Sequence, residues 1–209
     1  MKRLLIVGAA GLGRETLDIA RVLEPIAPWR IGGFLDSRKD ILAGKQAGLA
    51  IVGSPDSFNP GPDDLLVCAI GEPAVKRRYV EMLVARGAQF ATLLHPESDI
   101  SPSARLGAGA VVMRSGRVGP AADVGDYVSI GYAAGIAHDV RVGRYCLLSG
   151  HAAANGRAVL EDEVTLGSHA VVLPDVVVGR GATVGAGSVA IRDVPAGATV
   201  FGIPATRLS

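Results

Sequence analysis

The amino-acid sequence is short of aromatic residues, of cysteine and of net charge, and it contains no long apolar run. Aromatics make up only 4% of its 209 residues, which excludes a core built on large rings, whereas a hydrophobic content of 49% is enough to fill a core of small side chains. The formal net charge of +1, without a run of Lys or Arg, excludes the basic surface that nucleic acids and anionic membranes require. No apolar stretch approaches the roughly 18 residues of a membrane-spanning helix. We therefore expect a cytoplasmic protein without nucleic-acid or membrane partners.

The two cysteines exclude a disulfide framework and a zinc site by their number and spacing. Cys68 lies in an apolar, strand-like stretch, and Cys146 occupies an inward position of the repeat described next. We expect both to be buried, reduced thiols.

A six-residue repeat runs without interruption from Ile100 to Val189. Fourteen of its fifteen hexads open with Ile, Leu or Val, the next residue is Gly in eight of them, and the residue four positions after the opening one is always Ala, Gly, Val, Cys or Ser. This period fits neither an amphipathic helix nor simple strand alternation, and it is typical of a solenoid whose coils have three flat faces. The aliphatic and the small positions would both point into a narrow core, and the glycines would relieve the backbone torsions of the corners.

Three hexads make one coil of 18 residues, so the repeat predicts five coils stacked at about 4.8 Å, in a prism about 24 Å long. No loop interrupts the period, so an active site in this region has no long lid of its own. Pro195, Pro204 and the tail after the repeat are expected to cap the last coil, whose open edge would otherwise invite pairing.

Residues 1–97 follow the alternating pattern of an α/β domain with a small parallel sheet, and residues 98–209 form the solenoid domain with its cap. We predict strands at residues 4–8, 31–35, 65–70 and 90–94, and helices at residues 14–23 and 74–86. Ligands bind such sheets at the carboxyl ends of the strands, where residues 11–13, Asp36 and Gly71 lie.

The glycine turn at residues 8–13 precedes a predicted helix, whose free N–H groups and dipole favour a diphosphate. Asp36 could accept hydrogen bonds from ribose hydroxyls. The glycines have the order G-x-x-G-x-G and not the dinucleotide-binding order G-x-G-x-x-G, so a tight strand-to-helix connection without a ligand is an open alternative.

Together, the repeat and these motifs resemble one family of enzymes. The hexads are similar to those of the left-handed β-helix, or hexapeptide-repeat, acyltransferases. Among them, the chain resembles the sugar O-acyltransferase, sialic acid O-acetyltransferase (NeuD) family and its PglD-like nucleotide-sugar N-acetyltransferases of the bacillosamine and perosamine pathways. The stretches that carry the resemblance are residues 7–15, 34–36, 69–71, 94–96, 136–143 and 202–205.

This resemblance implies a Rossmann-like N-terminal domain that holds a nucleotide-activated amino sugar, and a left-handed parallel β-helix that holds acetyl-CoA without a metal. It also implies a homotrimer with active sites between subunits. The implied substrate-binding residues are Ala10, Gly11, Leu12, Asp36, Ser37 and Gly71. The implied acetyl-CoA-binding residues are Gly156, Ser168 and Ala186.

His138 matches the family's catalytic histidine, a general base, and an imidazole suits that role because it can be neutral and still basic at cell pH. The resemblance assigns the adjacent Asp139 to orient or modulate it, although alternation along a strand would turn the two side chains to opposite sides. Gly156 stacks one coil after His138, which would leave room for a thioester, and a backbone N–H there could stabilise the oxyanion. The alternative is a solvated histidine on the outside of the coil.

The remaining histidines have structural interpretations. His151 and His169, eighteen residues apart, are expected to stack as a surface ladder, with a metal pair as the alternative. His95 is expected to be structural because it precedes Pro96 at the domain junction. Some positions differ from the residues found in one branch of the family, which leaves the acceptor undefined; these are Leu12, Ser37, Glu72 and Leu147.

These observations predict an acetyl-CoA-dependent N-acetyltransferase that acts on a UDP-, GDP- or dTDP-linked amino sugar by direct transfer. A sugar O-acetyltransferase of the sialic acid type is the alternative. A non-catalytic β-helix scaffold remains a further possibility. So does a metal-dependent solenoid enzyme, although the histidine spacings do not resemble those of the carbonic anhydrase kind.

Overall fold

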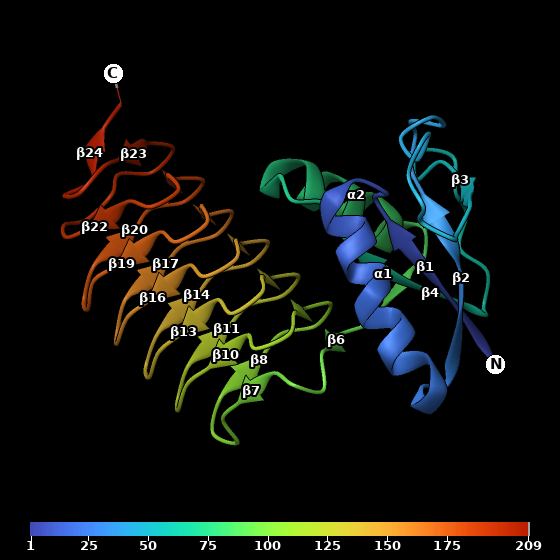
Figure 1. The fold of residues 1–209 in the computed structure, drawn as a ribbon, viewed down its shortest axis with the longest axis horizontal. Helices are drawn as coiled ribbons and strands as arrows, with labels where there is room; N and C mark the ends of the chain where they lie inside the picture. The colour runs from blue at the N-terminus through green and yellow to red at the C-terminus, as the bar shows by residue number, and fades with distance from the viewer. Residues whose placement is uncertain (209) are drawn as a thin grey trace. The chain divides into compact units, whose positions relative to one another are not determined.

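The chain divides into two compact units, Met1–Leu93 and Leu94–Ser209, and the computed structural model describes every residue except 209. The first unit is an α/β domain, and the second is a parallel β-solenoid (Figure 1). The division lies slightly before the boundary at residue 97 that the change of sequence pattern suggests, and it falls within β6 (Leu93–Leu94), the first strand of the solenoid.

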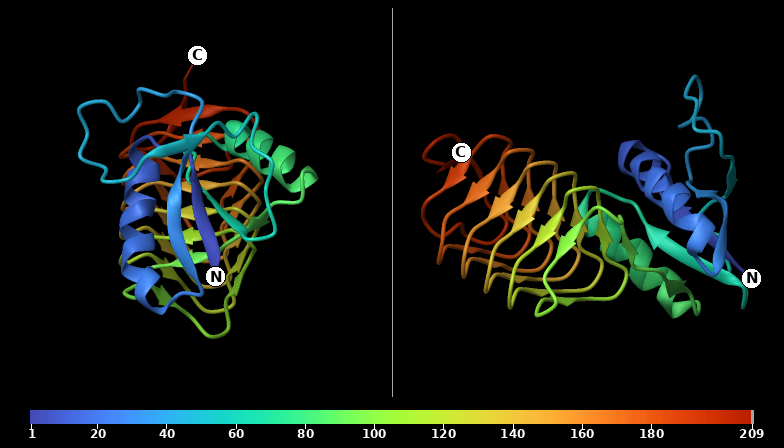
Figure 2. Two further views of the ribbon diagram at one scale, coloured as in Figure 1. Left: turned by 90° about the vertical axis from the view of Figure 1, so that its right-hand side faces the viewer. Right: turned by 60° about the horizontal axis from the view of Figure 1, so that its bottom comes forward.

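The α/β unit has a five-stranded parallel sheet of order β3-β2-β1-β4-β5. Its elements are β1 (Lys2–Val7), α1 (Gly11–Leu23), the 3-10 turn η1 (Glu24–Ile26), β2 (Trp29–Leu35), β3 (Ile51–Gly53), β4 (Asp64–Cys68), α2 (Pro73–Ala85) and β5 (Gln89–Phe90). The helices α1 and α2 cover opposite faces of this sheet (Figure 2). Within residues 1–208, no helix is both long and apolar enough to cross a membrane.

The central strand β1 determines where a ligand can bind in this unit. From β1 the chain continues through α1 to β2 on one side, whereas β4 pairs with β1 on the other side and leads through α2 to β5. The carboxyl ends of β1 and β4 therefore form the switch point of the sheet, where diverging connections leave a crevice. The turns at residues 8–10 and 69–72 border this crevice.

The single strand predicted at residues 90–94 is wrong, because this segment supplies one short strand to each unit. Gln89–Phe90 is β5 and pairs with β4 in the α/β sheet, whereas Leu93–Leu94 is β6 and joins a solenoid sheet beside β9. Leu94 lies six residues before Ile100 and is therefore in phase with the hexads. The short strand β3 was not predicted at all.

The solenoid consists of very short strands in three sheets, one for each flat face. One sheet contains β7 (Asp99–Ile100), β10 (Arg117–Val118), β13 (Gly135–Ile136), β16 (Ala153–Ala154), β19 (Val171–Val172) and β22 (Val189–Ala190). The next contains β8 (Arg105–Leu106), β11 (Asp123–Val124), β14 (Arg141–Val142), β17 (Val159–Leu160) and β20 (Val177–Val178). The third contains β6 (Leu93–Leu94), β9 (Val111–Val112), β12 (Ser129–Ile130), β15 (Leu147–Leu148), β18 (Thr165–Leu166), β21 (Thr183–Val184), β23 (Thr199–Phe201) and β24 (Thr206–Arg207).

The register between coils confirms the 18-residue period. Ile136 pairs with Val118 before it and with Ala154 after it, and each pairing is parallel. The hexads extend beyond the predicted limits, since β6 and β22 continue the same phase. After the repeat, β23 adds to one sheet in parallel and β24 turns back to pair with it antiparallel, which closes that edge.

A narrow core of small and branched side chains runs along the solenoid axis. Both inward positions of the hexad are buried, as predicted, for example Ile136 and Val140 in one hexad and Leu160 and Val164 in another. Close stacking of these compact side chains supplies the hydrophobic stabilisation of the solenoid. The chain has few aromatic side chains whose burial could supply it instead.

The glycines after the opening aliphatic residue have a different role from the one predicted. The left-handed backbone of each corner lies two residues further on and is mostly occupied by other residue types, such as Asp139 (φ 59) and Arg157 (φ 61). The glycines are required instead because successive coils approach closely: a Cβ on Gly143 would lie 2.5 Å from the backbone nitrogen of Asp162. They permit stacking and do not relieve torsion.

Both cysteines are buried free thiols, as predicted. Burial raises the pKa of the Cys68 thiol to about 11, a little offset by the positive charge of Lys76. Cys68 is therefore a poor nucleophile at neutral pH.

Gly143→Ala is expected to destabilise the solenoid by about 1–3 kcal/mol, because the new methyl group forces two coils apart. Gly135→Ala is the matched control, since no atom lies within 4 Å of its added Cβ and its backbone is not left-handed. Thermal and urea unfolding of the two variants test this. Equal stability of the two variants would contradict the stacking role of Gly143.

Candidate active site

A cavity of about 510 Å³ lies at the carboxyl ends of β1, β2 and β4, entirely within the α/β unit. Most of the substrate-binding residues implied by the sequence line it, namely Ala10, Leu12, Asp36, Ser37 and Gly71, while Gly11 does not. The sequence did not indicate Arg38, Arg78 or Tyr79, which also line it. The guanidinium of Arg78 lies 4.6 Å from the centre of the Tyr79 ring, so a cation–π contact holds it at the cavity.

The glycines of the first turn divide into structural and unconstrained positions. Gly8 has a φ of 98°, and a Cβ on Gly13 would lie 2.1 Å from the carbonyl oxygen of Gly8, so both are needed for the tight strand-to-helix connection. Gly11 has no such constraint, because nothing lies within 4 Å of its added Cβ. Its missing side chain leaves open space at the first residue of α1.

The N-termini of the two helices differ in what they offer to an anion. The cap of α1 is Ala10, which makes no side-chain capping bond, so the first N–H groups of α1 stay available. The cap of α2 is Glu72, whose carboxylate accepts from the backbone N–H groups of Ala74 (3.2 Å) and Val75 (2.7 Å). Of the two, only α1 presents an uncapped positive end.

The carboxylate of Asp36 lies at the cavity and is fully used by hydrogen bonds within the protein. It has no lone pair left to accept a hydrogen bond from a ribose hydroxyl. Its carboxylate accepts from the Ala9 amide (2.9 Å), from the Arg38 amide (3.0 Å) and from two Arg38 guanidinium nitrogens (both 2.9 Å). These four donors fill the acceptor positions of a carboxylate. The expected bond from Asp36 to a ribose hydroxyl would require Arg38 to leave, so the group presented to a ligand is the guanidinium of Arg38.

The same contacts set the ionisation of Asp36. Burial by itself raises its pKa, but the hydrogen bonds from the Arg38 side chain and the Ala9 amide outweigh burial, and the pKa lies below its ordinary value of 3.8. Asp36 is therefore an anion whose charge neutralises Arg38 at the cavity mouth.

On the solenoid, His138 and Asp139 form a hydrogen-bonded pair at the corner after β13. The Nδ1 atom of His138 lies 2.8 Å from Oδ2 of Asp139, and both side chains are about half exposed, at 55% and 54%. Because a carboxylate can only accept, Nδ1 carries the proton in this bond. Strand alternation does not separate the two side chains, since Asp139 sits in the left-handed corner and not in a strand.

The remaining ring nitrogen of His138 is available for chemistry. Among the described residues, none is hydrogen-bonded to Nε2. With the proton on Nδ1, Nε2 carries the lone pair that a general base needs.

Gly156 lies directly under the imidazole, one coil later. A Cβ at Gly156 would lie 2.6 Å from Cε1 and 2.7 Å from Nε2 of His138. The imidazole itself therefore lies where a side chain at position 156 would be. The N–H of Gly156 has no acceptor within residues 1–208, because Pro174, one coil later, carries no acceptor side chain. At the equivalent position Arg144, by contrast, the N–H bonds to Asp162.

The three residues implied for acetyl-CoA lie at two different corners of the solenoid. Gly156 follows β16, at the corner of His138, whereas Ser168 and Ala186 follow β18 and β21 in a different sheet. Ser168 and Ala186 occupy equivalent positions on successive coils. The two groups therefore belong to separate edges of one chain.

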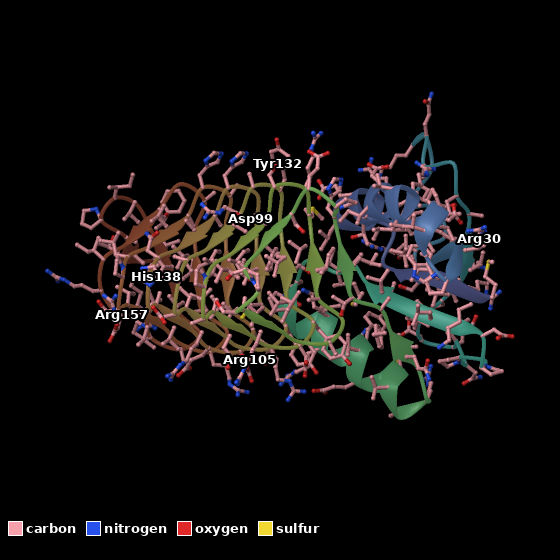
Figure 3. The ribbon with its side chains drawn as sticks, turned by 90° about the horizontal axis from the view of Figure 1, so that it is seen from below. Arg30, Asp99, Arg105, Tyr132, His138 and Arg157 are labelled. Carbon is pink, nitrogen blue, oxygen red and sulfur yellow. The ribbon has the colours of Figure 1, made fainter. Side chains whose placement is uncertain are left out.

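The other histidines are not part of the His138 site. His151 and His169 stack with ring centres 4.6 Å apart and planes within 7°, and Tyr132 meets His151 edge-on. Figure 3 shows Tyr132 on a different edge from His138. The Nδ1 atom of His95 accepts from the Glu97 amide at 3.0 Å, a local turn contact. Residues 1–208 contain no group of three metal-ligating side chains that could hold an ion.

Comparison with known proteins identifies the family. Residues 3–83 match the PglD N-terminal domain, and residues 157–191 match the bacterial transferase hexapeptide (six repeats). A GDP-perosamine N-acetyltransferase of Escherichia coli O157:H7 is 30% identical over 97% of this chain and 95% of its own length. The chain therefore belongs to the hexapeptide-repeat acyltransferases with a PglD-type N-terminal domain.

Two solved structures share the fold over nearly the whole chain. The acetyltransferase domain of PglB from Neisseria gonorrhoeae FA1090, in complex with acetyl coenzyme A, is 30% identical, with a TM-score of 0.88 and 99% of each chain covered. PerB from Caulobacter crescentus, in complex with CoA and GDP-perosamine, is 27% identical, with a TM-score of 0.89, and the match covers 100% of this chain and 98% of PerB.

Asp36→Asn is expected to lower the free energy of unfolding by about 1–3 kcal/mol at neutral pH, because the amide leaves Arg38 without its counter-charge. The folded-state pKa of Asp36 lies below the unfolded value, so its stabilising effect is complete above about pH 4 and is lost as the pH falls through the lowered value. Urea unfolding at pH 7 and at about pH 3 should therefore show a gap between parent and variant that narrows in acid. Asp40→Asn, at an exposed position, is the control. A gap of the same size at both pH values would refute this role for the carboxylate.

Proposed function

We propose that this protein is an N-acetyltransferase that moves the acetyl group of acetyl-CoA to the amino group of a nucleotide-linked amino sugar. The observation that carries the proposal is the His138–Asp139 pair, with Nε2 unoccupied, in a chain that also has a cavity lined by two arginines at the switch point of its α/β sheet. The relatives named for perosamine acetylation, and the PglB and PerB complexes, support both substrate classes.

In the α/β unit, the α1 N-terminus, Arg38 and Arg78 are the groups proposed to bind the diphosphate. The uncapped helix end supplies N–H donors, and the two guanidinium groups supply positive charge at the cavity. The residues Ala10, Gly11, Leu12, Ser37 and Gly71 are proposed to contact the nucleotide-sugar through backbone and small side chains. Asp36 is proposed to act indirectly, by holding Arg38.

In the proposed reaction, the amino nitrogen of the sugar attacks the thioester carbonyl carbon while Nε2 of His138 takes a proton from that nitrogen. Asp139 stabilises the resulting imidazolium through Nδ1–H. The Gly156 N–H is proposed to donate to the tetrahedral oxyanion. When the carbon–sulfur bond breaks, the departing CoA thiolate takes this proton from the His138 imidazolium. The products are the amide and free CoA, and no acyl-enzyme forms.

We also propose that the working enzyme is a homotrimer. Gly156 and the Ser168–Ala186 pair lie at different corners of one chain, so an acetyl-CoA lying between two subunits could contact Gly156 of one chain and Ser168 and Ala186 of the next. A site between subunits also fits the absence of a lid loop from the hexad repeat. We propose a cytoplasmic location because acetyl-CoA and nucleotide-sugars are made there.

His138→Ala is expected to lower kcat by about 100- to 10,000-fold, since the proton of the attacking amine then has no acceptor. The Michaelis constants should change little, and the variant should remain a folded oligomer. Release of the CoA thiol gives the rate, with His151→Ala as the matched control. Full activity of His138→Ala would rule out His138 as the base.

A nucleotide diphosphate is expected to stabilise the protein against heat, by about 2.7 kcal/mol when its concentration is 100 times its dissociation constant. Thermal unfolding with UDP, GDP or dTDP measures this, and the corresponding nucleosides without phosphates are the control. Arg78→Ala should remove most of the stabilisation. If no nucleotide acts and a free sugar is acetylated instead, the sialic-acid-type O-acetyltransferase replaces the present proposal.

A further inference from the structure

The corner that carries His138 continues along the solenoid as a column of charged residues. Asp139, Arg157 and Asp175 occupy the same position in three successive coils, and all three have left-handed backbones. The N–H of Arg157 donates to the carbonyl oxygen of His138 at 3.1 Å, so its backbone directly adjoins that of the histidine. Figure 3 shows His138 and Arg157 close together on this part of the solenoid.

Three other arginines of this solenoid reach back to the aspartate one coil before, whereas Arg141, which stacks after Asp123, forms no ion pair with it in the described residues. Arg117 contacts Asp99 at 3.3 Å, and Arg180 contacts Asp162 at 3.0 Å. Arg144 approaches Asp126 in the same direction, at 3.9 Å. In each pair, the carboxylate belongs to the residue eighteen positions before the arginine.

Arg157 points in the opposite direction to these three arginines. Asp139 lies eighteen positions before it, but its guanidinium points forward to Asp175, with Nε 2.7 Å from Oδ1 and the second nitrogen 2.8 Å from Oδ2. This two-pronged contact is the strongest geometry available to an arginine and a carboxylate. Within the described residues, the Asp139 carboxylate therefore has His138 as its side-chain partner.

The three charges are nevertheless electrostatically linked. The pKa of Arg157 is raised by the hydrogen bond and charge of Asp175, and to a smaller extent by the charge of Asp139. A guanidinium turned toward Asp139 would compete with the imidazole N–H for the same carboxylate, since charged donors form the stronger hydrogen bonds.

We propose that Asp175 is a positioning residue for the reaction: it holds Arg157 away from Asp139, so that Asp139 keeps the His138 proton on Nδ1 and Nε2 remains the base. This inference rests on the proposed role of His138. Asp175 itself does not contact the imidazole, and its effect passes through Arg157 and Asp139.

Other charged groups near Asp139 do not replace this arrangement. Arg105, Asp123 and Arg141 line a depression of about 320 Å³ that Asp139 borders, but in the described residues neither arginine forms an ion pair with Asp139. All three residues are unchanged in the variants below. Differences in kcat between those variants therefore reflect the position of the Arg157 guanidinium.

The test is a cycle of Asp175→Asn, Arg157→Ala and the double variant. Asp175→Asn should lower kcat about ten-fold, with little change in either Michaelis constant, because Arg157 turns to Asp139 and weakens one charge-assisted hydrogen bond. Arg157→Ala should keep kcat within about two-fold of the parent, since it removes the competitor. The double variant should recover to the level of Arg157→Ala. A double variant as impaired as Asp175→Asn would overturn the proposal, as would a parental kcat in Asp175→Asn.

A spectroscopic readout makes the test independent of turnover. The nitrogen-15 shifts of the His138 ring, assigned by their loss in His138→Ala, should report the Nδ1–H tautomer in the parent, a shift toward Nε2–H in Asp175→Asn and its reversal in the double variant. Asp99→Asn removes an exposed partner of Arg117 in the same sheet as β13, two coils before it, and is the matched control for losing a carboxylate. It should leave kcat and tautomer unchanged. An unchanged tautomer in Asp175→Asn sinks the positioning role. An active His138→Ala instead sinks the proposed base and leaves the tautomer result standing.

Discussion

Parallel backbone pairing between residues eighteen positions apart is the interaction on which the solenoid and its site depend. Strands only two residues long have little stability of their own, and each is held by the strand before it and the strand after it. Adjacent backbones lie about 4.8 Å apart, so the residue eighteen positions away decides how much room a side chain has. The imidazole of His138 can occupy its place against the next coil because position 156 is glycine. A site in this fold is best understood as columns of stacked residues and less well as segments of sequence.

The left-handed corner residue is the second element that shapes the site. Left-handed backbone is unfavourable for most residues, yet Asp139, Arg157 and Asp175 all adopt it. Each donates its N–H to a carbonyl oxygen of the preceding coil, as Asp139 does to Pro120 at 3.0 Å, and this hydrogen bond helps to fix the corner. The same conformation swings the Asp139 carboxylate to the side of the imidazole. The histidine–aspartate contact is thus a product of corner geometry.

Sequence reasoning succeeded where a periodic pattern reports burial and failed where a contact crosses between positions of unrelated sequence. The inward hexad positions, the 18-residue register and the α/β character of the first unit were predictable because they follow from side-chain size and spacing. The purpose of the glycines was misjudged, since inter-coil distance is not visible in a single hexad. The division of residues 89–94 between two sheets was missed because two-residue strands look like one strand. At the cavity, Asp36 was predicted as a ligand group, but its partner Arg38 is only two residues away and satisfies it first.

The exposure of the histidine–aspartate pair connects catalysis to assembly. Half-exposed charges are screened by water, so the hydrogen bond between them is weaker in that state than in a dry site. The same bond strengthens when water is removed, because the effective dielectric falls. The solenoid has no lid loop to exclude water from this pair. The surfaces that exclude water must therefore belong to a bound substrate or to a neighbouring chain. In the proposed trimer, the surface that brings acetyl-CoA to His138 would also remove the water that weakens the His138–Asp139 bond. The base would then be fully organised only when both substrates are in place, which would limit futile hydrolysis of the thioester.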